Sequence, residues 1–418
     1  MAQRQRRWLT DEATVGRLVR LIGIAHTTQP QEDMPALIAT RWSPLRRLLA
    51  FSMGSLCAAL LLFLAGCEGE FDYRPEATGP EAEITVVTDT NSWNGPVGEA
   101  LRNELGKYVT TLPTPEQAFD IKHASITSQR EFDRLTRFKN IVVAAPLSDT
   151  TNEAKFLKSI LSEEAQQAIA EGGNAVVPRE DVWRRRQQVV YVTAATPTDL
   201  AATIASDGES IRNRFDIATR ERMYREMFER GRQPEIEQEL METHGFAVNA
   251  QHDYLIAIDT TNFVWLRRIL SDTWRSLFIY YEENANPADL TPEWVYSTRD
   301  SLARRYLQGN SGGWVEVDRR RPLETEEINF LDRYALETRG LWQMVGRIDG
   351  EDVQFGMGGP FLTYAFYDQP SGRLYLIDGM VFAPSFKKRE FLRQMEVIAY
   401  TFRTQQEAEA EAQLAENE

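Results

Sequence analysis

The sequence is poor in the side chains that most often carry out chemistry. Its 418 residues include two cysteines, four histidines and seven lysines among 47 basic residues. Cys57 and Cys67 lie within or directly after one apolar run near the N-terminus, so the remainder cannot form disulfides, cysteine nucleophiles or thiolate zinc sites. The later histidines, His123, His244 and His252, lack the His-x-x-x-His spacing of a zinc-binding helix. We expect neither a metal nor a cofactor.

The chain is also short of positive charge. It has 47 basic and 62 acidic residues, a formal net charge of −15. Affinity for duplex nucleic acid rests on neutralising phosphates, so we expect no nucleic-acid partner. Removing residues 1–66 takes away eight basic and four acidic side chains and leaves 39 − 58 = −19. The apolar fraction of 42% is enough to build cores, which excludes wholesale disorder.

One apolar run, residues 48–66, follows the basic pair Arg46 and Arg47. A basic flank, an apolar stretch and small residues at its end are typical of a secretory signal peptide. The run ends in Leu64-Ala-Gly-Cys67, which resembles the box of bacterial lipoproteins. That resemblance implies cleavage before Cys67 and its acylation, including by palmitate, which would hold the protein on a membrane. The alternative is a transmembrane anchor, because the run is long enough to span a bilayer.

The segment around the signal peptide gives two further expectations. Sixty-six residues is long for a signal, and Met34 begins an ordinary positively charged start, so we predict that translation begins there and that residues 1–33 are an extension. Glu68 follows the cysteine, and no Asp stands there to resemble an inner-membrane retention signal. We therefore expect an outer-membrane lipoprotein of the cell envelope that faces either the periplasm or the outside.

Periodicity predicts an α+β protein with two α/β-sandwich-like halves, in which mostly antiparallel sheets are covered by helices. In the first half, the order strand, helix, two strands, helix, strand favours a ferredoxin-like arrangement, with one continuous helix over 152–171. In the second half, strands over 334–345, 361–367 and 373–382 precede a closing helix. The predicted segments are an extension and signal (1–66), a tether (67–83), a first domain (84–197), a helical connector (198–232), a second domain (233–403) and an acidic tail (404–418).

One motif bears on catalysis. Gly309-x-Ser311-x-Gly313 has the letters of a nucleophile elbow, but a helix precedes it and a strand follows, the reverse of the required order. No other catalytic set is visible, so we lean away from an enzyme. The alternative is a periplasmic or surface hydrolase with a dispersed active site. A pocket where His244 or His252 meets a carboxylate and a hydroxyl would favour it.

Several second-half motifs resemble domain-of-unknown-function family 4837, uncharacterised lipoproteins of Gram-negative envelopes. They are Asn262-Phe-Val-Trp-Leu-Arg267, Arg299-Asp-Ser-Leu-Ala-Arg-Arg-Tyr306, Glu337-Thr-Arg-Gly-Leu-Trp342, Met357-Gly-Gly-Pro-Phe361 and Asp378-Gly-Met-Val-Phe-Ala-Pro384. In the first half, Ile141-Val-Val and Asp181-Val-Trp-Arg resemble it less sharply, so the likeness extends over about 84–403. The resemblance implies a lipid-anchored α+β envelope protein of unknown molecular function and supplies no activity.

The candidate functional surface lies within these motifs. Arg339, Trp342, Met357, Gly358 and Gly359 combine a cation, a large aromatic ring and a glycine turn, which favours binding of an envelope protein, a glycan or a lipid. The alternative is that these residues form a fold-defining hairpin junction. We therefore expect a non-enzymatic binding or scaffold lipoprotein.

Overall fold

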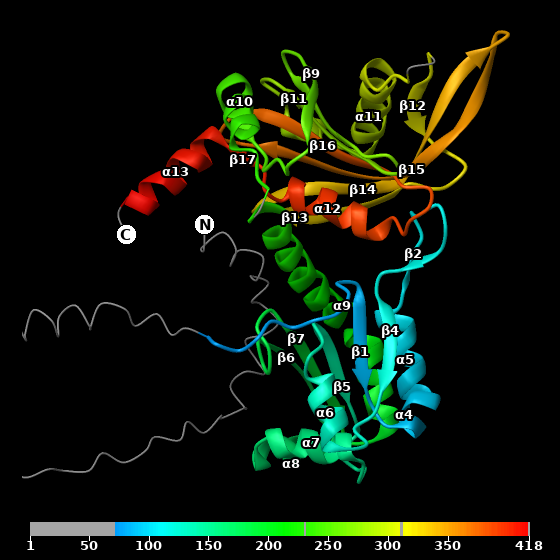
Figure 1. The fold of residues 1–418 in the computed structure, drawn as a ribbon, viewed down its shortest axis with the longest axis vertical. Helices are drawn as coiled ribbons and strands as arrows, with labels where there is room; N and C mark the ends of the chain where they lie inside the picture. The colour runs from blue at the N-terminus through cyan, green and yellow to red at the C-terminus, as the bar shows by residue number, and fades with distance from the viewer. Residues whose placement is uncertain (1–71, 230, 310–311, 417–418) are drawn as a thin grey trace, which may run out of the picture.

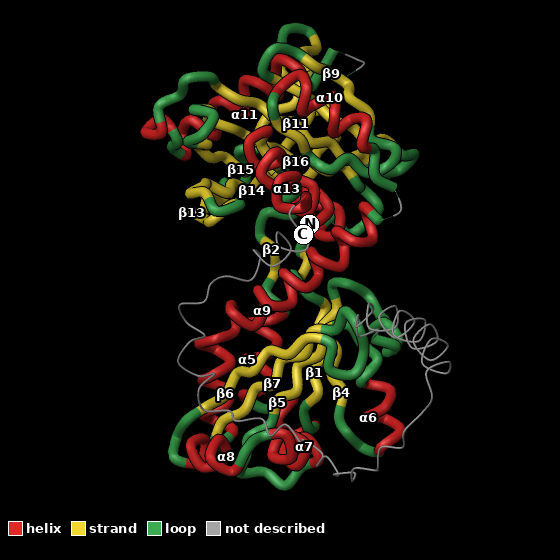
Figure 2. Tube along the Cα trace, turned by 90° about the vertical axis from the view of Figure 1, so that its left-hand side faces the viewer, coloured by secondary structure: helices red, strands yellow, loops and turns green. Residues whose placement is uncertain are grey.

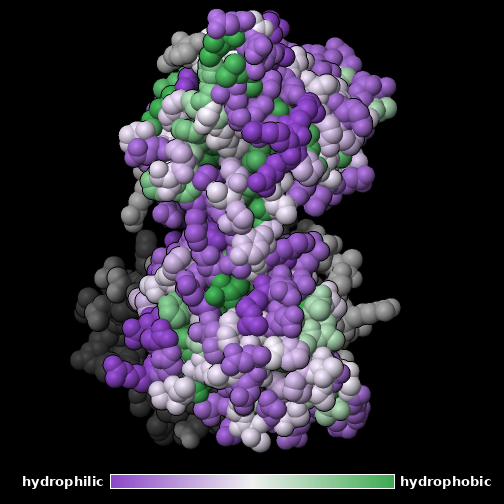
Figure 3. Space-filling view, turned by 90° about the vertical axis from the view of Figure 1, so that its right-hand side faces the viewer, coloured by the Kyte–Doolittle hydropathy of each residue, from purple (hydrophilic) through white to green (hydrophobic). Residues whose placement is uncertain are grey.

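The protein consists of two lobes joined by a narrower waist (Figures 1 and 2). The computed structural model describes residues 72–229, 231–309 and 312–416. The predictions on the signal segment, Met34 and Cys67 fall outside these ranges. Within them, no helix has both the length and the apolarity needed to cross a membrane. Hydrophilic side chains dominate the face shown in Figure 3, where hydrophobic ones form only small patches.

The first lobe is built on a five-stranded sheet in the order β4-β1-β5-β7-β6. Its elements are β1 (Glu83–Val87), α4 (Thr90–Asn94), α5 (Pro96–Leu105), β2 (Tyr108–Val109), β3 (Glu116–Gln117), β4 (Asp120–Ala124), α6 (Gln129–Leu135), β5 (Asn140–Ala144), α7 (Asn152–Ile160), α8 (Glu163–Ala170), β6 (Asn174–Glu180), β7 (Gln188–Ala194) and α9 (Pro197–Phe228). β1 pairs in parallel with β4 and β5, and β5 pairs in parallel with β7. Only β6 is antiparallel to its neighbour.

Helices cover both faces of this sheet. Leu101 of α5 and Ile204 of α9 pack on one face, whereas Leu157 of α7 and Ile169 of α8 pack on the other. Every residue of β5 and β7 is buried, as expected for parallel strands covered on both sides. The expected ferredoxin-like arrangement is therefore wrong for this lobe, because that topology needs antiparallel neighbours and three of the four pairings here are parallel.

The second lobe is a larger, wholly antiparallel sheet in the order β12-β14-β15-β16-β11-β10-β9, with β13 also paired to β14. Its elements are α10 (Pro234–His244), β8 (Phe246–Ala247), β9 (Leu255–Asp259), β10 (Phe263–Ile269), β11 (Trp274–Glu282), η3 (Pro287–Asp289), α11 (Pro292–Tyr306), β12 (Trp314–Val317), β13 (Glu324–Phe330), β14 (Arg333–Ile348), β15 (Glu351–Asp368), β16 (Arg373–Phe382), α12 (Arg389–Ala399), β17 (Arg403–Thr404) and α13 (Gln405–Glu416). α12 packs on one face and α11 on the other. Antiparallel pairing predominates over the whole chain, and the α+β class is confirmed.

The long helix α9 contributes to both lobes. Its first half packs on the first sheet, whereas Met223, Met227 and Phe228 near its end belong to the core beneath the second sheet. The β2–β3 excursion adds Leu112, 1% exposed, to the same second core. The second lobe alone would therefore lack part of its own core.

Charged side chains line the contact between the lobes. The backbone N–H groups of Lys388 and Arg389, at the start of α12, donate to the buried carboxylate of Glu116 at 2.9 and 3.1 Å. Arg389 also pairs with Asp120 at 2.6 Å, and Arg393 pairs with Asp216 at 2.9 Å. These contacts connect α12 of the second lobe to β3, β4 and α9 of the first.

Candidate functional site

The most prominent surface feature is an arm formed by the outer parts of β14 and β15, the orange ribbon that projects from the second lobe in Figure 1. β12 accompanies β14 only as far as Val345, and β16 accompanies β15 only from Phe361 onward. Between these points, residues 346–360 pair only within the β14–β15 hairpin among the described residues. We call residues 346–360 the arm. Both of its edges present unpaired backbone groups.

The tip of the arm is a tight turn with apolar residues beside it. Asp349 and Gly350 both have positive φ, 53° and 88°, as a type I′ hairpin turn requires. Ile348 and Val353 are 51% and 38% exposed, which places two aliphatic side chains in solvent.

The structure separates two of the predicted surface residues. Arg339 lies on the α12 face of β14, where it pairs with Glu337 at 2.5 Å and with Glu396 of α12 at 2.7 Å. Trp342 lies on the opposite face, is 5% exposed, and donates from Nε1 to the Val381 carbonyl at 3.2 Å. Arg339 and Trp342 therefore do not share one surface.

The other predicted residues lie at the base of the arm. A Cβ on Gly359 would overlap the Val381 carbonyl, and one on Gly358 would come within 2.6 Å of the Trp342 carbonyl. Met357 packs at the edge of the same core as Trp342. The two glycines thus permit a close backbone approach where the arm leaves the sheet. Partner binding by the five predicted residues stays a prediction.

One histidine meets a carboxylate and a hydroxyl. His244 is 2% exposed; its Nε2 lies 2.9 Å from Asp259 Oδ1, and its Nδ1 lies 3.1 Å from the Tyr281 hydroxyl. That hydroxyl donates to the Thr261 carbonyl at 2.7 Å, so its single proton has an acceptor other than the histidine. A nucleophile must instead give its proton to the histidine.

Burial also raises the pKa of Tyr281, which opposes formation of a phenolate. The cluster therefore supports a role in holding the end of α10 against the sheet rather than in hydrolysis. Ser311 of the elbow-like motif falls outside the described residues.

A fully buried ion pair was not singled out from the sequence, although both members lie in the family-like motifs. Arg299 of α11 and Asp378 of β16 are 1% and 0% exposed, with Nε and Oδ2 2.7 Å apart. Thr363 donates to the same Oδ2 at 2.6 Å, and the guanidinium stacks 3.5 Å from the Phe361 ring centre. Burial raises the pKa of Asp378 despite the neighbouring cation. The pair fixes α11 to the sheet.

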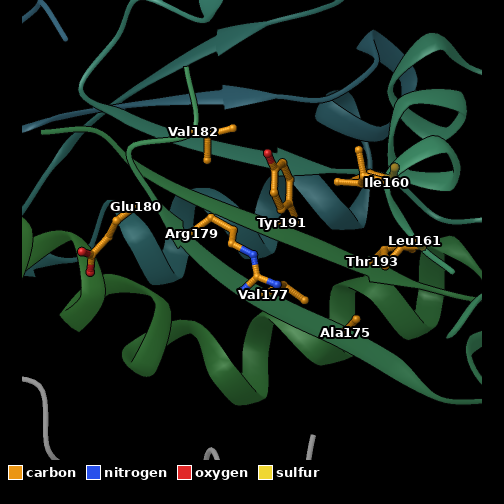
Figure 4. A pocket seen from close by; sticks show the side chains of 10 residues that line it. Ile160, Leu161, Ala175, Val177, Arg179, Glu180, Val182, Tyr191 and Thr193 are labelled. Carbon is orange, nitrogen blue, oxygen red and sulfur yellow. The ribbon is translucent and has the colours of Figure 1, made fainter. Parts of the chain in front are cut away.

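The first lobe contains a cavity of ≈ 370 Å³ on the outer hairpin of its sheet (Figure 4). It lies between the β6–β7 hairpin and α7 with the turn that follows. Its lining residues are Leu157, Ile160, Leu161, Ala175, Val177, Arg179, Glu180, Val182, Tyr191 and Thr193. Aliphatic side chains predominate, and the volume lies within the usual range of small-molecule pockets, about 300–1,000 Å³. No sequence motif indicated this cavity.

Comparison with known proteins finds a family model that matches each lobe. Residues 77–228 match a family described as Domain of unknown function (DUF8532), and no curated protein matches the chain. A solved structure with detectable similarity is the Ran-binding protein Mog1p of Saccharomyces cerevisiae, at 10% identity over 38% of this chain and 90% of that one. Its TM-score of 0.26 is too low to carry an argument. The first-half likeness noted at Ile141 and Asp181 thus falls within a different family from the one expected. Residues 233–401 match Domain of unknown function (DUF4837), the family that the motifs of the second half indicated.

Proposed function

We propose that the protein is a lipid-anchored protein of the cell envelope that binds a partner and catalyses no reaction. The apolar run that ends in Leu64-Ala-Gly-Cys67 supports acylation at Cys67 and export. The acidic residues directly after it favour the outer membrane. The hydroxyl beside His244, that of Tyr281, donates to the Thr261 carbonyl, which weighs against the alternative of a hydrolase.

The arm is the observation that carries the binding role. Over residues 351–357, β15 pairs only with β14 among the described residues, and an extended segment of another protein can add to its other edge as a further strand. Main-chain hydrogen bonds would supply affinity, and the exposed Val353 and Ile348 would supply apolar contacts. The partner is therefore an envelope protein that offers an extended segment.

Photo-crosslinking in intact cells tests this contact. A photoreactive amino acid at Val353 should yield a protein adduct, whereas the same probe at Leu414, 58% exposed on the helix α13, should not. Val353→Lys should abolish the interaction, because a lysine on an edge strand blocks further strand addition. Equal adducts from both positions, or none from Val353, would refute the role of the arm.

The anchor is tested separately. Cells fed an alkyne analogue of palmitate should label the protein, and Cys67→Ser should remove both the label and the protein's sedimentation with outer membranes. Membrane association that persists in the unlabelled variant would instead support a transmembrane anchor.

A further inference from the structure

The cavity of the first lobe has an apolar wall and one polar end. Leu157 and Ile160 of α7 face Ala175 and Val177 of β6 across it. Tyr191 and Arg179 lie in the midst of the lining side chains, whereas Glu180 points away from them (Figure 4). A pocket of this kind suits a ligand that is mostly hydrocarbon with one polar group.

Tyr191 supplies an unused hydrogen-bond donor. The residue is 8% exposed, its ring packs against Phe156 at 6.0 Å between centres, and its hydroxyl has no hydrogen-bond partner among the described residues. The hydroxyl therefore has a hydrogen-bond donor to offer a ligand that enters the cavity. Burial raises the pKa of Tyr191 to about 12, against a smaller lowering by the charge of Arg179. The phenol is thus protonated at neutral pH and able to donate.

Arg179 supplies an unused cation beside it. Its side chain is exposed, and its Nη1 donates to the adjacent Pro178 carbonyl at 3.2 Å. No carboxylate in the described parts of the chain forms an ion pair with it, although acidic residues outnumber basic ones overall. A guanidinium is matched in shape and charge to a carboxylate, with which it forms paired hydrogen bonds.

We propose that this cavity binds a free fatty acid. The hydrocarbon chain lies against Leu157, Ile160 and Val177, and the carboxylate meets Arg179 and accepts a hydrogen bond from Tyr191. Removing the chain from water supplies affinity in proportion to its apolar area. The charged head group selects a fatty acid over an uncharged lipid of the same length.

The test uses the full-length protein as cells process it, reconstituted in lipid nanodiscs. The probe is a palmitate analogue with a diazirine at the chain end and an alkyne for detection. After irradiation, mass spectrometry should locate the label on the cavity wall, at Leu157, Ile160 or Val177. Unlabelled palmitate should compete with the probe, and hexadecanol should compete more weakly.

Two variants and a control separate the apolar and polar contributions. Val177→Phe should abolish labelling by filling the cavity. Arg179→Ala should weaken competition by palmitate about tenfold while leaving hexadecanol unchanged, since a lost charge-assisted hydrogen bond is of that order. Arg130→Ala, which removes an exposed arginine on α6, should change neither.

Label located outside the cavity, or equal loss of palmitate and hexadecanol competition in Arg179→Ala, would overturn the proposal. Unchanged labelling of a folded Val177→Phe protein would also overturn it. If Val177→Phe does not fold, the contrast between acid and alcohol in Arg179→Ala decides the question.

Discussion

At the scale of single residues, the buried pair formed by Arg299 and Asp378 is a place where loss of one side chain should cost much stability. Both charges are buried away from water. Removing one of them leaves the other unpaired in the low-dielectric interior, which is strongly unfavourable. We expect Asp378→Leu to lower the free energy of unfolding by about 3–5 kcal/mol, the usual cost of breaking a buried pair from one side. Urea denaturation measures the change.

Two controls accompany that experiment. Asp352→Ala breaks the exposed pair with Arg347 on the arm and should cost less than about 1 kcal/mol. Arg299→Met combined with Asp378→Leu should recover most of the stability, because two apolar side chains of similar volume replace the pair. A single-variant cost no larger than that of Asp352→Ala would contradict the argument.

A second residue-scale prediction concerns Glu221 of α9. Burial, followed by the nearby charge of Glu180, raises its pKa from 4.5 to about 7. The folded state therefore holds this proton more tightly than the unfolded state. The stabilisation is present below pH 4.5 and is lost as the pH rises to about 7.

Glu221→Gln should remove this loss and make the protein more stable than the wild type at pH 8, by about 1–3 kcal/mol. Unfolding curves recorded between pH 4.5 and 8 measure the effect. Glu209→Gln, at an exposed position of the same helix, is the control. If the free energies of unfolding of the wild type and of Glu221→Gln differ by the same amount at every pH, this mechanism is ruled out.

At the scale of elements, α12 begins with a cap supplied by the other lobe. Lys388 at its N-cap position makes no side-chain cap, and Glu116 of β3 accepts the first backbone N–H groups instead. A carboxylate at a helix N-terminus satisfies unpaired donors and interacts favourably with the helix dipole. This contact ties the start of α12 to the first lobe.

Glu116→Ala should therefore lower the free energy of unfolding by about 1–2 kcal/mol, as the loss of a good cap does. Thermal unfolding monitored by circular dichroism measures it. Glu99→Ala, in the exposed first turn of α5, is the comparison and should cost less. Equal effects of the two substitutions would show that Glu116 is not acting as a cap.

Elements with a run of buried apolar residues were predictable from the sequence, whereas exposed elements were not. The strand predicted over 373–382 is β16, a run of buried residues, whereas the polar β13 and the outer part of the arm carry no burial pattern and are strands only because of their partners. The expected helix over 152–171 is two helices, since Ser162 caps α8 after a break at Leu161. The parallel pairings of the first lobe arise from long-range contacts that element order does not encode.

At the scale of the whole molecule, the second lobe depends on the first for part of its core. Met223, Met227 and Phe228 of α9 and Leu112 of the β2–β3 excursion pack with residues of the second sheet and α12. A chain of residues 231–416 alone would expose that apolar surface. It should bind a hydrophobic dye and unfold at a lower urea concentration than the full protein.

Removal of residues 405–416, which form the terminal helix α13, is the comparison. It takes away none of the buried residues of that core and should shift the midpoint much less. An isolated second lobe as stable as the intact protein would show that α9 and Leu112 are dispensable.

The candidate cavity illustrates why sites of this kind are not visible in a sequence. Its lining comes from α7, β6, β7 and the turns beside them, and each residue alone suits an ordinary strand or helix. Tyr191 and Arg179 become notable only because, within the described residues, the Tyr191 hydroxyl has no hydrogen-bond partner and Arg179 has no ion-pair partner. Arg339 and Trp342 show the converse. They are close in sequence, but residues an odd number of positions apart on a strand point to opposite faces, so their side chains do not meet.

The sharing of α9 has an evolutionary consequence. The two family matches meet between residues 228 and 233, but the last turns of α9 lie before that boundary and pack inside the second lobe. Recombination at the boundary would separate the two lobes. A descendant with the first lobe would keep α9 with an uncovered apolar end, and a descendant with the second lobe would have a sheet with an incomplete core. The unit that can be inherited or exchanged intact is therefore larger than either family match and includes both.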